Sequence, residues 1–398
     1  MTRQIWIMLL CGVLIVLATN GLRQTFGIFL RPIALDLDIS RQMFGFVIAF
    51  QTLLSGLTQP VAGMLADRYG AVKLIIGGTL FYALGLWLLS VSANALDLQI
   101  SLGLLIGLGL SGASQVIVLG AVGKIVPNER RGMVFGTVIA AGSLGMFFLV
   151  PGIQGMLDIF GWRETLAMMA AIMVVVPLLS IGLRSGPIVV DAGPKQSLRQ
   201  AIEEARGHSG FLLLTVGFFV CGFHVTFIAT HFPAYLADNG VSLTAAAYAL
   251  GVIGLFNVIG AYLFGALGDR FRKKNVLTLI YGLRAVVMVL ILLIPINDVT
   301  GIIFGAALGI LWLATVPLTS GIVAQVFGPR YFSMLYGVVF MSHQIGGFTG
   351  AWLGGYIYDL TGSYDLMWGI SVALGLAAAA LHWPISDQPV ARMAGQTN

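Results

Sequence analysis

Long runs of apolar residues alternate along this chain with short turns that hold most of its charged residues. A helix of about 20 apolar residues crosses the hydrocarbon core of a bilayer, so this pattern predicts a chain that spans a membrane many times. Most of the turns are short, so neighbouring helices are expected to pack antiparallel. We place twelve such helices, at residues 4–30, 42–66, 73–93, 98–124, 132–156, 163–184, 210–236, 243–268, 275–295, 299–326, 331–357 and 364–385.

One polar stretch, residues 185–209, is much longer than the other turns. Its prolines and charges predict a cytoplasmic linker between two six-helix halves, residues 1–184 and 210–398, and its part 196–206 is a candidate for a short surface helix. The first apolar run starts at Ile5, behind Arg3. It is too long for a signal peptide and no small-residue cleavage site follows it, so we expect a retained first span.

The composition is that of a membrane protein. Apolar residues make up 58% of the 398 residues and charged residues only 9%, which is too little charge to cover a soluble protein of this size. The net charge of +5 comes from basic turns and does not indicate nucleic-acid binding. Cys11 and Cys221 each lie inside an apolar run, so we expect neither a disulfide nor a metal framework.

Lysine and arginine are distributed unevenly between the two sides of the predicted bundle. Sixteen fall on the side of the N-terminus, and three fall on the opposite side, namely Arg31, Arg41 and Arg163. Because basic turns tend to stay in the cytoplasm, this distribution predicts an inner or plasma membrane protein with both termini cytoplasmic. The two remaining arginines, Arg23 and Arg284, fall inside predicted helices.

A short pattern occurs twice, 202 residues apart, after the second and the eighth predicted helix. The copies read Gly63-Met64-Leu65-Ala66-Asp67-Arg68 and Gly265-Ala266-Leu267-Gly268-Asp269-Arg270. Further residues recur 201 positions on, as the pairs Gly136 and Gly337, Gly145 and Gly346, Asp158 and Asp359, and Gly161 and Gly362. A constant offset over several elements predicts a duplicated chain, with two parallel halves around a central cavity.

The repeated glycine–aspartate–arginine turn resembles the signature of the major facilitator superfamily, and the resemblance covers essentially the whole chain. It implies an all-α membrane fold of twelve helices in two pseudo-symmetric six-helix halves, and a carrier that works as a monomer without a cofactor. The segments Asn20–Leu22 and Phe26–Phe29 are similar to the first helix of monocarboxylate porters and oxalate–formate antiporters. Those carriers place an arginine on helix 8, whereas this chain has Asn257 and Ala261 in that region.

The repeated turns have two interpretations. In the superfamily that the chain resembles, they hold the halves together in the outward-open state and release as the carrier rocks. That role would assign conformational gating to Gly63, Asp67, Arg68, Gly265, Asp269 and Arg270. The aspartates can accept hydrogen bonds from helix N-terminal amides or pair with the adjacent arginines. The simpler interpretation is that the arginines only fix the orientation of the chain.

Arg23 and Arg284 are candidates for substrate binding, because a charge inside the membrane is expensive and is often functional. No aspartate or glutamate falls in the central part of any predicted span, so neither arginine has an obvious counter-ion. A bound organic anion would supply the missing charge. Asn20, Arg23 and Gln24 share one helix face. The alternatives are that Arg23 reaches the membrane surface and that Arg284 bonds to backbone carbonyls.

Other polar residues in the predicted helices complete the candidate site. His224, His231 and His343 can donate to a carboxylate and take up a proton near neutral pH, which suits coupling to protons. Gln115 and Asn257 lie on helices that line the cavity in the fold that the chain resembles. Each of these residues also has a structural interpretation, as a hydrogen-bonded packing residue. No pair of metal ligands has helical spacing, so no metal site is expected.

The sequence therefore predicts a secondary active transporter of a small organic anion, most simply a monocarboxylate. Transport would occur by alternating access, with a proton or a counter-anion as the coupling ion. The alternative is an exporter of a neutral or drug-like solute. An enzyme is not expected, because the chain has no Gly-x-Ser-x-Gly, no His-Glu-x-x-His and no phosphate-binding loop. The expected partners are an anionic small molecule, the coupling ion and the lipid bilayer.

Overall fold

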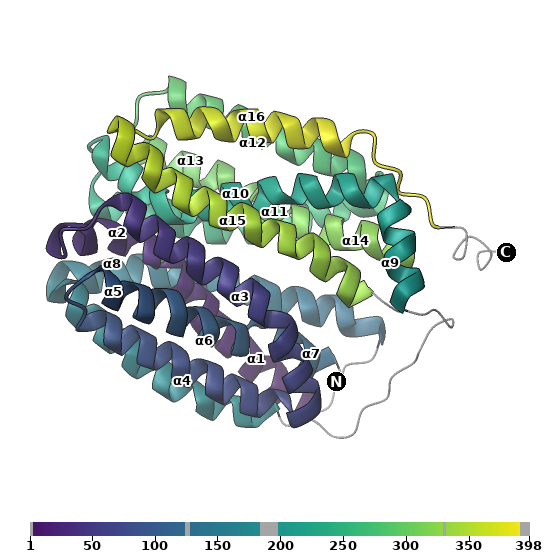
Figure 1. Ribbon diagram of the computed structural model, residues 1–398, viewed down its shortest axis with the longest axis horizontal. Coiled ribbons are helices and arrows are strands. Elements are labelled where there is room, and N and C mark those ends of the chain that lie inside the picture. Colours follow the sequence, from purple (N-terminus) through teal and green to yellow (C-terminus); the bar gives the residue numbers. More distant parts are fainter. Residues whose placement is uncertain (1–2, 124–127, 184–197, 329–331, 391–398) are drawn as a thin grey trace.

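The computed structural model describes residues 3–123, 128–183, 198–328 and 332–390, and within these ranges the chain is helical without a strand. The first group of helices, the N-terminal bundle, packs beside the second, the C-terminal bundle (Figure 1). The N-terminal bundle comprises α1 (Arg3–Gln24), α2 (Phe26–Asp36), α3 (Arg41–Tyr69), α4 (Ala71–Ser90), α5 (Ala95–Leu98), α6 (Ile106–Gly112), α7 (Gln115–Gly123) and α8 (Asn128–Ser180). The C-terminal bundle comprises α9 (Leu198–Gly207), α10 (Ser209–Asp238), α11 (Leu243–Arg270), α12 (Lys273–Leu293), α13 (Asp298–Ile310), α14 (Thr315–Phe327), α15 (Phe332–Thr361) and α16 (Asp365–His382).

The predicted all-α membrane fold is confirmed, and each predicted span coincides with helix. Three spans are interrupted: α1 is followed by α2, α6 by α7 and α13 by α14, while a π-helical stretch, Gln99–Leu105, joins α5 to α6. Conversely, α8 joins two predicted spans through Gly161, whose φ of 81° turns the chain between them. Within the described ranges, nine helical segments are long and apolar enough to cross a membrane, and one of them, Thr137–Leu183, has 47 residues, the length of two spans.

The predicted linker is only partly visible. Its surface helix is present as α9, on which Arg199 and Glu203 form an exposed ion pair. Residues 185–197 lie outside the described part of the chain. The division at 184 and 210 therefore remains a prediction.

The duplication extends to the helix caps. Ser40 and Ser242, 202 positions apart, cap α3 and α11, and each side chain accepts a hydrogen bond from the amide three residues on. Asn94 and Asn297 cap α5 and α13 in the same manner. Such caps satisfy amides that the first helical turn leaves without partners. Equivalent sequence positions therefore begin equivalent helices in the two bundles.

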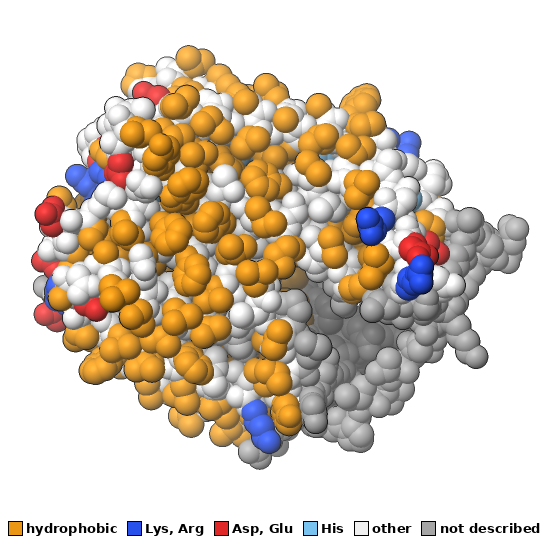
Figure 2. All heavy atoms as spheres, in the orientation of Figure 1, with side chains coloured by type: hydrophobic (Ala, Val, Ile, Leu, Met, Phe, Trp, Pro, Cys, Tyr) orange, Lys and Arg blue, Asp and Glu red, His pale blue; other side chains and the backbone are white. Residues whose placement is uncertain are grey.

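Hydrophobic side chains cover the visible face of the molecule between its two ends, and the charged side chains gather at those ends (Figure 2). Among the exposed residues are large apolar ones such as Trp87, Phe148, Tyr262 and Leu376. A soluble surface rarely shows so continuous an apolar area, whereas a bilayer requires one. The band between the charged ends is therefore the lipid-facing surface.

The two bundles meet most closely toward the end remote from the chain termini, which we call the far end (left in Figure 1). There the helices approach through glycines. A Cβ on Gly27 of α2 would lie 2.1 Å from the carbonyl oxygen of Ala229 on α10, and one on Gly45 of α3 would lie 2.4 Å from that of Ala351 on α15. Because these contacts are with backbone, no side-chain movement could make room.

Candidate functional site

Three predicted site residues make polar contacts in the N-terminal bundle, where Asn20 of α1 contacts Gln115 of α7 and Arg23 of α1 contacts α3, while the fourth, Gln24, is the last residue of α1. The Asn20 amide donates to Oε1 of Gln115 over 3.3 Å, and Nη2 of Arg23 donates to the hydroxyl of Thr52 over 3.3 Å. All four predicted residues are half-buried. None of the ion pairs in the described part of the chain includes Arg23. The arrangement is a partly accessible cation bonded to a neutral hydroxyl.

Helix interruptions place these groups. Arg23 lies in the last turn of α1, directly before the break at Thr25. The carbonyl of Leu22, which the break would leave without a partner, accepts from both the amide and the hydroxyl of Thr25. Gln115 likewise begins α7 just after α6 has ended. Interrupted membrane helices are tolerated where they line a cavity or are buried in protein, and in transporters they often mark the binding site.

Arg284 lies in a different environment, inside the C-terminal bundle. It is only 3% exposed, and its guanidinium donates to the carbonyls of Leu311 and Trp312, where α13 ends before α14. Its Nη2 also lies 3.8 Å from the sulfur of Cys221, while Nη1 has no partner among the described residues. The contacts are those of a cation that caps an interrupted helix, and they do not bring Arg284 to the group around Arg23.

The remaining predicted residues are buried and engaged. His224 donates from Nε2 to the carbonyl of Ser371 over 2.9 Å, within the C-terminal bundle. His343 contacts Oε1 of its neighbour Gln344 over 3.2 Å and stacks on the ring of Phe340. In the described part of the chain, no three histidine, cysteine or acidic side chains are arranged to hold a metal ion.

Asn257 uses both ends of its amide. It donates to the hydroxyl of Ser143 on α8 over 2.7 Å, and its oxygen accepts from the amide of Leu313 over 2.9 Å. The residue therefore joins the interruption between α13 and α14 to the opposite bundle. Gln344 forms a second polar link at comparable depth, because its amide nitrogen donates to the carbonyl of Thr52 over 2.9 Å. Thr52 thus contacts both Arg23 and the C-terminal bundle.

Among the described residues of the two repeated turns, none forms a hydrogen bond or ion pair that joins the bundles. A Cβ on Gly63 or on Gly265 would meet no described atom within 4 Å, and Asp269 and Arg270 are exposed. The side chains of Asp67 and Arg68 lie outside the described set. Gating by these turns remains a prediction.

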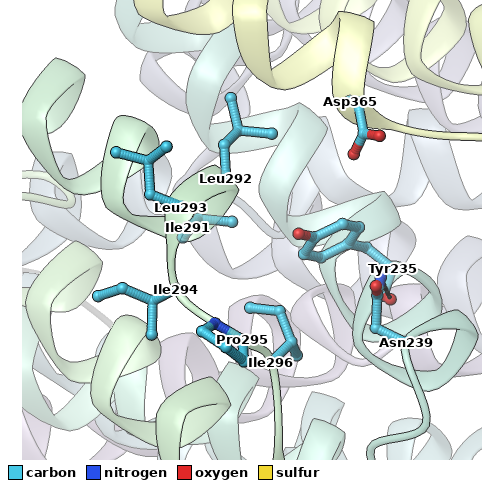
Figure 3. Close-up of a pocket in the computed structure, with 9 residues that line it drawn as sticks. All are labelled: Tyr235, Asn239, Ile291, Leu292, Leu293, Ile294, Pro295, Ile296 and Asp365. Atoms are coloured by element: carbon cyan, nitrogen blue, oxygen red, sulfur yellow. Dashed lines mark hydrogen bonds between the residues drawn. The ribbon is translucent and has the colours of Figure 1, made fainter.

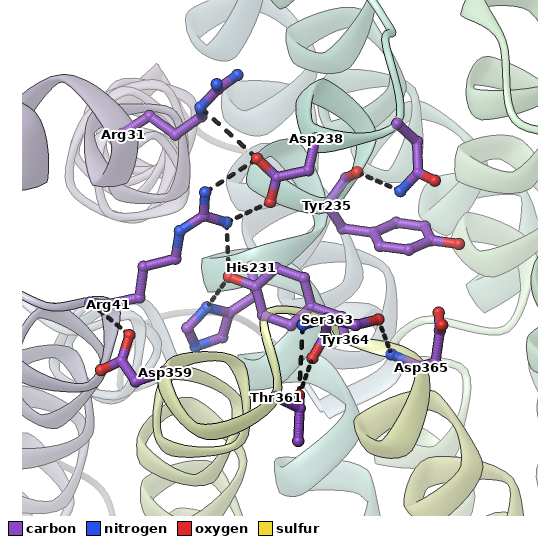
Figure 4. Close-up of polar contacts among 11 residues, drawn as sticks. Arg31, Arg41, His231, Tyr235, Asp238, Asp359, Thr361, Ser363, Tyr364 and Asp365 are labelled. Atoms are coloured by element: carbon purple, nitrogen blue, oxygen red, sulfur yellow. Dashed lines mark hydrogen bonds and ion pairs between the residues drawn. The ribbon is translucent and has the colours of Figure 1, made fainter.

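The far end carries a polar network that links the two bundles, and sequence reasoning did not select it. Arg41, at the start of α3, pairs bidentately with Asp238 at the end of α10, over 2.5 and 2.9 Å (Figure 4). Asp359 of α15 accepts from the backbone amides of Arg41 and Gln42. Arg31 lies 3.9 Å from the same Asp238 carboxylate. We call the set Arg31, Arg41, Asp238, Asp359 and Tyr364 the far gate.

Two signals in the sequence pointed to the far gate. Arg31 and Arg41 are two of the three basic residues on the side opposite the termini, and Asp359 belongs to the repeated set of residues. By themselves, the first observation indicates only the orientation of the chain and the second only its duplication. Pairing between positions as distant as 41 and 238 is not readable from one sequence, because it depends on how the two bundles dock.

A separate hollow of about 480 Å³ opens at the far end of the C-terminal bundle (Figure 3). None of the predicted site residues lines this hollow. We therefore do not assign it as the substrate-binding site on the basis of its volume. It is lined by Tyr235, Asn239, Ile291, Leu292, Leu293, Ile294, Pro295, Ile296 and Asp365.

The apolar surface, the two helical bundles and the interrupted helices with polar groups between them define a multi-pass membrane transporter. The sequence matches the family model of the Major Facilitator Superfamily over residues 8–316 and 214–396. The chain belongs to this superfamily, and it is a transporter rather than an enzyme.

Several relatives are similar over most of their length. The chain is 24% identical to an uncharacterized MFS-type transporter, YcxA, of Bacillus subtilis, with 98% of this chain and 97% of the relative covered. It is 24% identical to monocarboxylate transporter 13 of Bos taurus, with 91% and 84% covered. Among solved structures, a D-xylose–proton symporter superposes with a TM-score of 0.73 at 14% identity, covering 96% of this chain and 97% of the symporter. The predicted resemblance to the superfamily and to its monocarboxylate branch is thus confirmed.

Proposed function

We propose that this protein carries a small organic anion with a carboxylate group, bound by Arg23 near the interruption between α1 and α2. The observation that supports this most is the state of Arg23: half-buried, hydrogen-bonded to the hydroxyl of Thr52, and in none of the ion pairs among the described residues. A guanidinium can hold a carboxylate through two parallel hydrogen bonds. The names of relatives such as monocarboxylate transporters 11 and 13 agree with this class of substrate.

We infer further that the far end faces outward and that the protein lies in an inner or plasma membrane with cytoplasmic termini. The sixteen-to-three distribution of basic residues supports this orientation. With the far gate closed, the present conformation is then an inward-facing state. In that state the repeated turns would be released, which agrees with the finding that a Cβ on Gly63 or Gly265 would meet no described atom within 4 Å.

The second candidate is an exporter of a neutral or drug-like solute. It is favoured by Asn257, which stands near the place where similar carboxylate carriers have an arginine and whose amide is already engaged with Ser143 and Leu313. Among the described residues, the C-terminal bundle then supplies no cation comparable to Arg23, since Arg284 faces the carbonyls of Leu311 and Trp312. The proposal therefore requires only that Arg23 binds the anion, without a second cation from the C-terminal bundle. The experiment below tests this requirement.

The test is counterflow into proteoliposomes with labelled lactate, pyruvate, formate, oxalate and a neutral sugar, at two pH values. Removing one partner of a partly desolvated ion pair costs about 2–4 kcal/mol, so Arg23→Gln should raise the half-saturating concentration about 30- to 700-fold. Arg23→Lys should recover part of this loss, because it keeps the charge but lacks the planar fork. Arg199→Gln removes an exposed arginine and is the control.

Exchange of a carboxylate by the wild type whose half-saturating concentration rises by the expected factor in Arg23→Gln and is unchanged in Arg199→Gln would support the proposal. Well-folded wild-type protein that exchanges the sugar but no carboxylate would contradict it and favour the second candidate. A dependence of net uptake on an imposed pH gradient would identify the proton as coupling ion, and stimulation by a trans anion would identify a counter-anion.

A further inference from the structure

His231 occupies the contact between the bundles directly beneath the far gate (Figure 4). Its side chain is fully buried. A Cβ on Gly354 of α15 would lie 2.6 Å from its ring, and one on Gly45 of α3 would lie 3.4 Å from its Nε2. The imidazole therefore fills a slot between a helix of the C-terminal bundle and a helix of the N-terminal bundle. Separation of the bundles at the far end would uncover it.

The hydrogen bonds of His231 assign its protonation state in the closed gate. Nε2 lies 2.8 Å from the carbonyl oxygen of Ala351, which can only accept, so Nε2 carries a proton. Nδ1 lies 3.1 Å from the hydroxyl of Tyr364. The same hydroxyl oxygen is 3.3 Å from Nη1 of Arg41, which can only donate. Tyr364 thus accepts from Arg41 and donates to the bare Nδ1 of a neutral imidazole.

A second proton on His231 would disrupt this chain of bonds. Nδ1–H and the Arg41 guanidinium would then both donate to one phenolic oxygen, and the Tyr364 hydroxyl hydrogen would lose its acceptor. Two cations would meet in a buried site, where separation from water makes charge expensive. The acidic groups nearby are already engaged: Asp238 by Arg41, and Asp359 by two backbone amides.

The described charged groups around this imidazole are two arginines and two aspartates, and both aspartates are already engaged, so neither is free to stabilise a further positive charge. Arg41 stands on α3, and its guanidinium also lies 3.8 Å from the ring centre of Tyr358. The set is Arg31 from α2, Arg41 from α3, Asp238 from α10 itself, Tyr358 and Asp359 from α15, and Tyr364 from the start of α16.

We propose that His231 is a proton-binding site that is occupied when the far gate is open and must be vacated before the gate can close. Binding equilibria are reciprocal, so acid on the far side holds the gate open. For one proton, the ratio of open to closed protein rises by up to about tenfold for each unit of pH below the range near 6.5, where exposed histidine titrates. This inference concerns the gate and is independent of the transported solute.

The experiment measures the gate without substrate. Spin labels on Leu35→Cys of α2 and Leu360→Cys of α15, both exposed at the far end, report the separation of the bundles by double electron–electron resonance. Both native cysteines are first replaced by serine. Between pH 8 and pH 5 we expect the longer-distance population to grow. His231→Gln can accept from Tyr364 and donate to Ala351 but cannot gain a proton, so its distances should not change with pH.

His382→Gln is the matched control, since His382 is another buried histidine of the C-terminal bundle but bonds only to Ala378 of its own helix, α16, among the described residues. It should retain the wild-type pH response. If His231→Gln does not fold, hydrogen–deuterium exchange at the imidazole C2 carbon gives the titration of His231 in the wild type by mass spectrometry. Its midpoint should coincide with that of the distance change. A distance change that persists in His231→Gln, or a wild-type gate insensitive to pH, would overturn the proposal.

Discussion

Replacement of Gly27 by alanine tests whether glycine contacts alone permit the far end to close. Gly27 lies on α2 of the N-terminal bundle, and a Cβ there would stand 2.1 Å from the carbonyl oxygen of Ala229 on α10. Ordinary contacts of a Cβ are 3.4–4 Å. The two helices would have to separate by roughly 1 Å, and overpacking of this kind costs about 1–3 kcal/mol.

This penalty falls mainly on one of the two states. When the bundles part at the far end, Ala229 moves away and the added methyl group has room. The gain of about 1 kcal/mol that alanine brings to a helix is similar in both states and cancels. Gly27→Ala should therefore raise the ratio of open to closed protein about 5- to 150-fold.

The label pair at Leu35 and Leu360 measures this ratio directly. Gly77→Ala is the matched control, because it is also a helical glycine of the N-terminal bundle and a Cβ there meets no described atom within 4 Å. Wild-type and Gly77→Ala protein should show the short distance, and Gly27→Ala the long one. A short distance in all three, with normal melting, would refute the view that this contact limits closure.

Two further predictions concern the C-terminal bundle. Arg284→Lys keeps the charge but cannot reach both the Leu311 and Trp312 carbonyls. The free energy of unfolding should therefore fall by about 2–3 kcal/mol, without a change in the half-saturating substrate concentration. An altered substrate affinity with an unaltered melting temperature would instead make Arg284 a substrate ligand. The Arg272 guanidinium holds the pKa of Asp387 below its usual range, so this carboxylate stabilises the fold above about pH 3.9 and the contribution is lost on acidification. The melting temperature of Asp387→Asn should therefore lie below that of the wild type at pH 6 and approach it near pH 3, and an equal difference at both values would contradict the assignment.

The architecture was predictable because it follows from local signals. Runs of about 20 apolar residues indicate where helices cross the membrane, and the repeated turns together with the recurring glycines and aspartates indicate that the chain is duplicated. The interruptions were less visible. Thr25 and the segment 311–314 lie inside runs that are apolar enough to continue as helix, and they are interrupted because tertiary contacts, such as those of Arg284 and Asn257, satisfy the freed backbone.

The candidate site was predictable only where its residues share one helix. Asn20, Arg23 and Gln24 were grouped by their spacing, and the structure adds Gln115 from the predicted set and Thr52, which was not selected. The far gate joins positions that no spacing rule connects, since Arg41 meets Asp238 and Asp359 only after two bundles have docked.

Arg23 and Arg284 show why a charged residue inside a span does not define its own role. Arg23 precedes a helix interruption and Arg284 faces one, and at each interruption backbone carbonyls lose their helical partners. At the first interruption, Thr25 satisfies the carbonyl of Leu22, so Arg23 is not needed there and donates instead to the hydroxyl of Thr52. At the second, the carbonyls of Leu311 and Trp312 accept from Arg284 itself. The hydroxyl of Thr25 thus takes the place of an arginine as partner of the freed carbonyl at the first interruption, whereas Arg284 itself is that partner at the second.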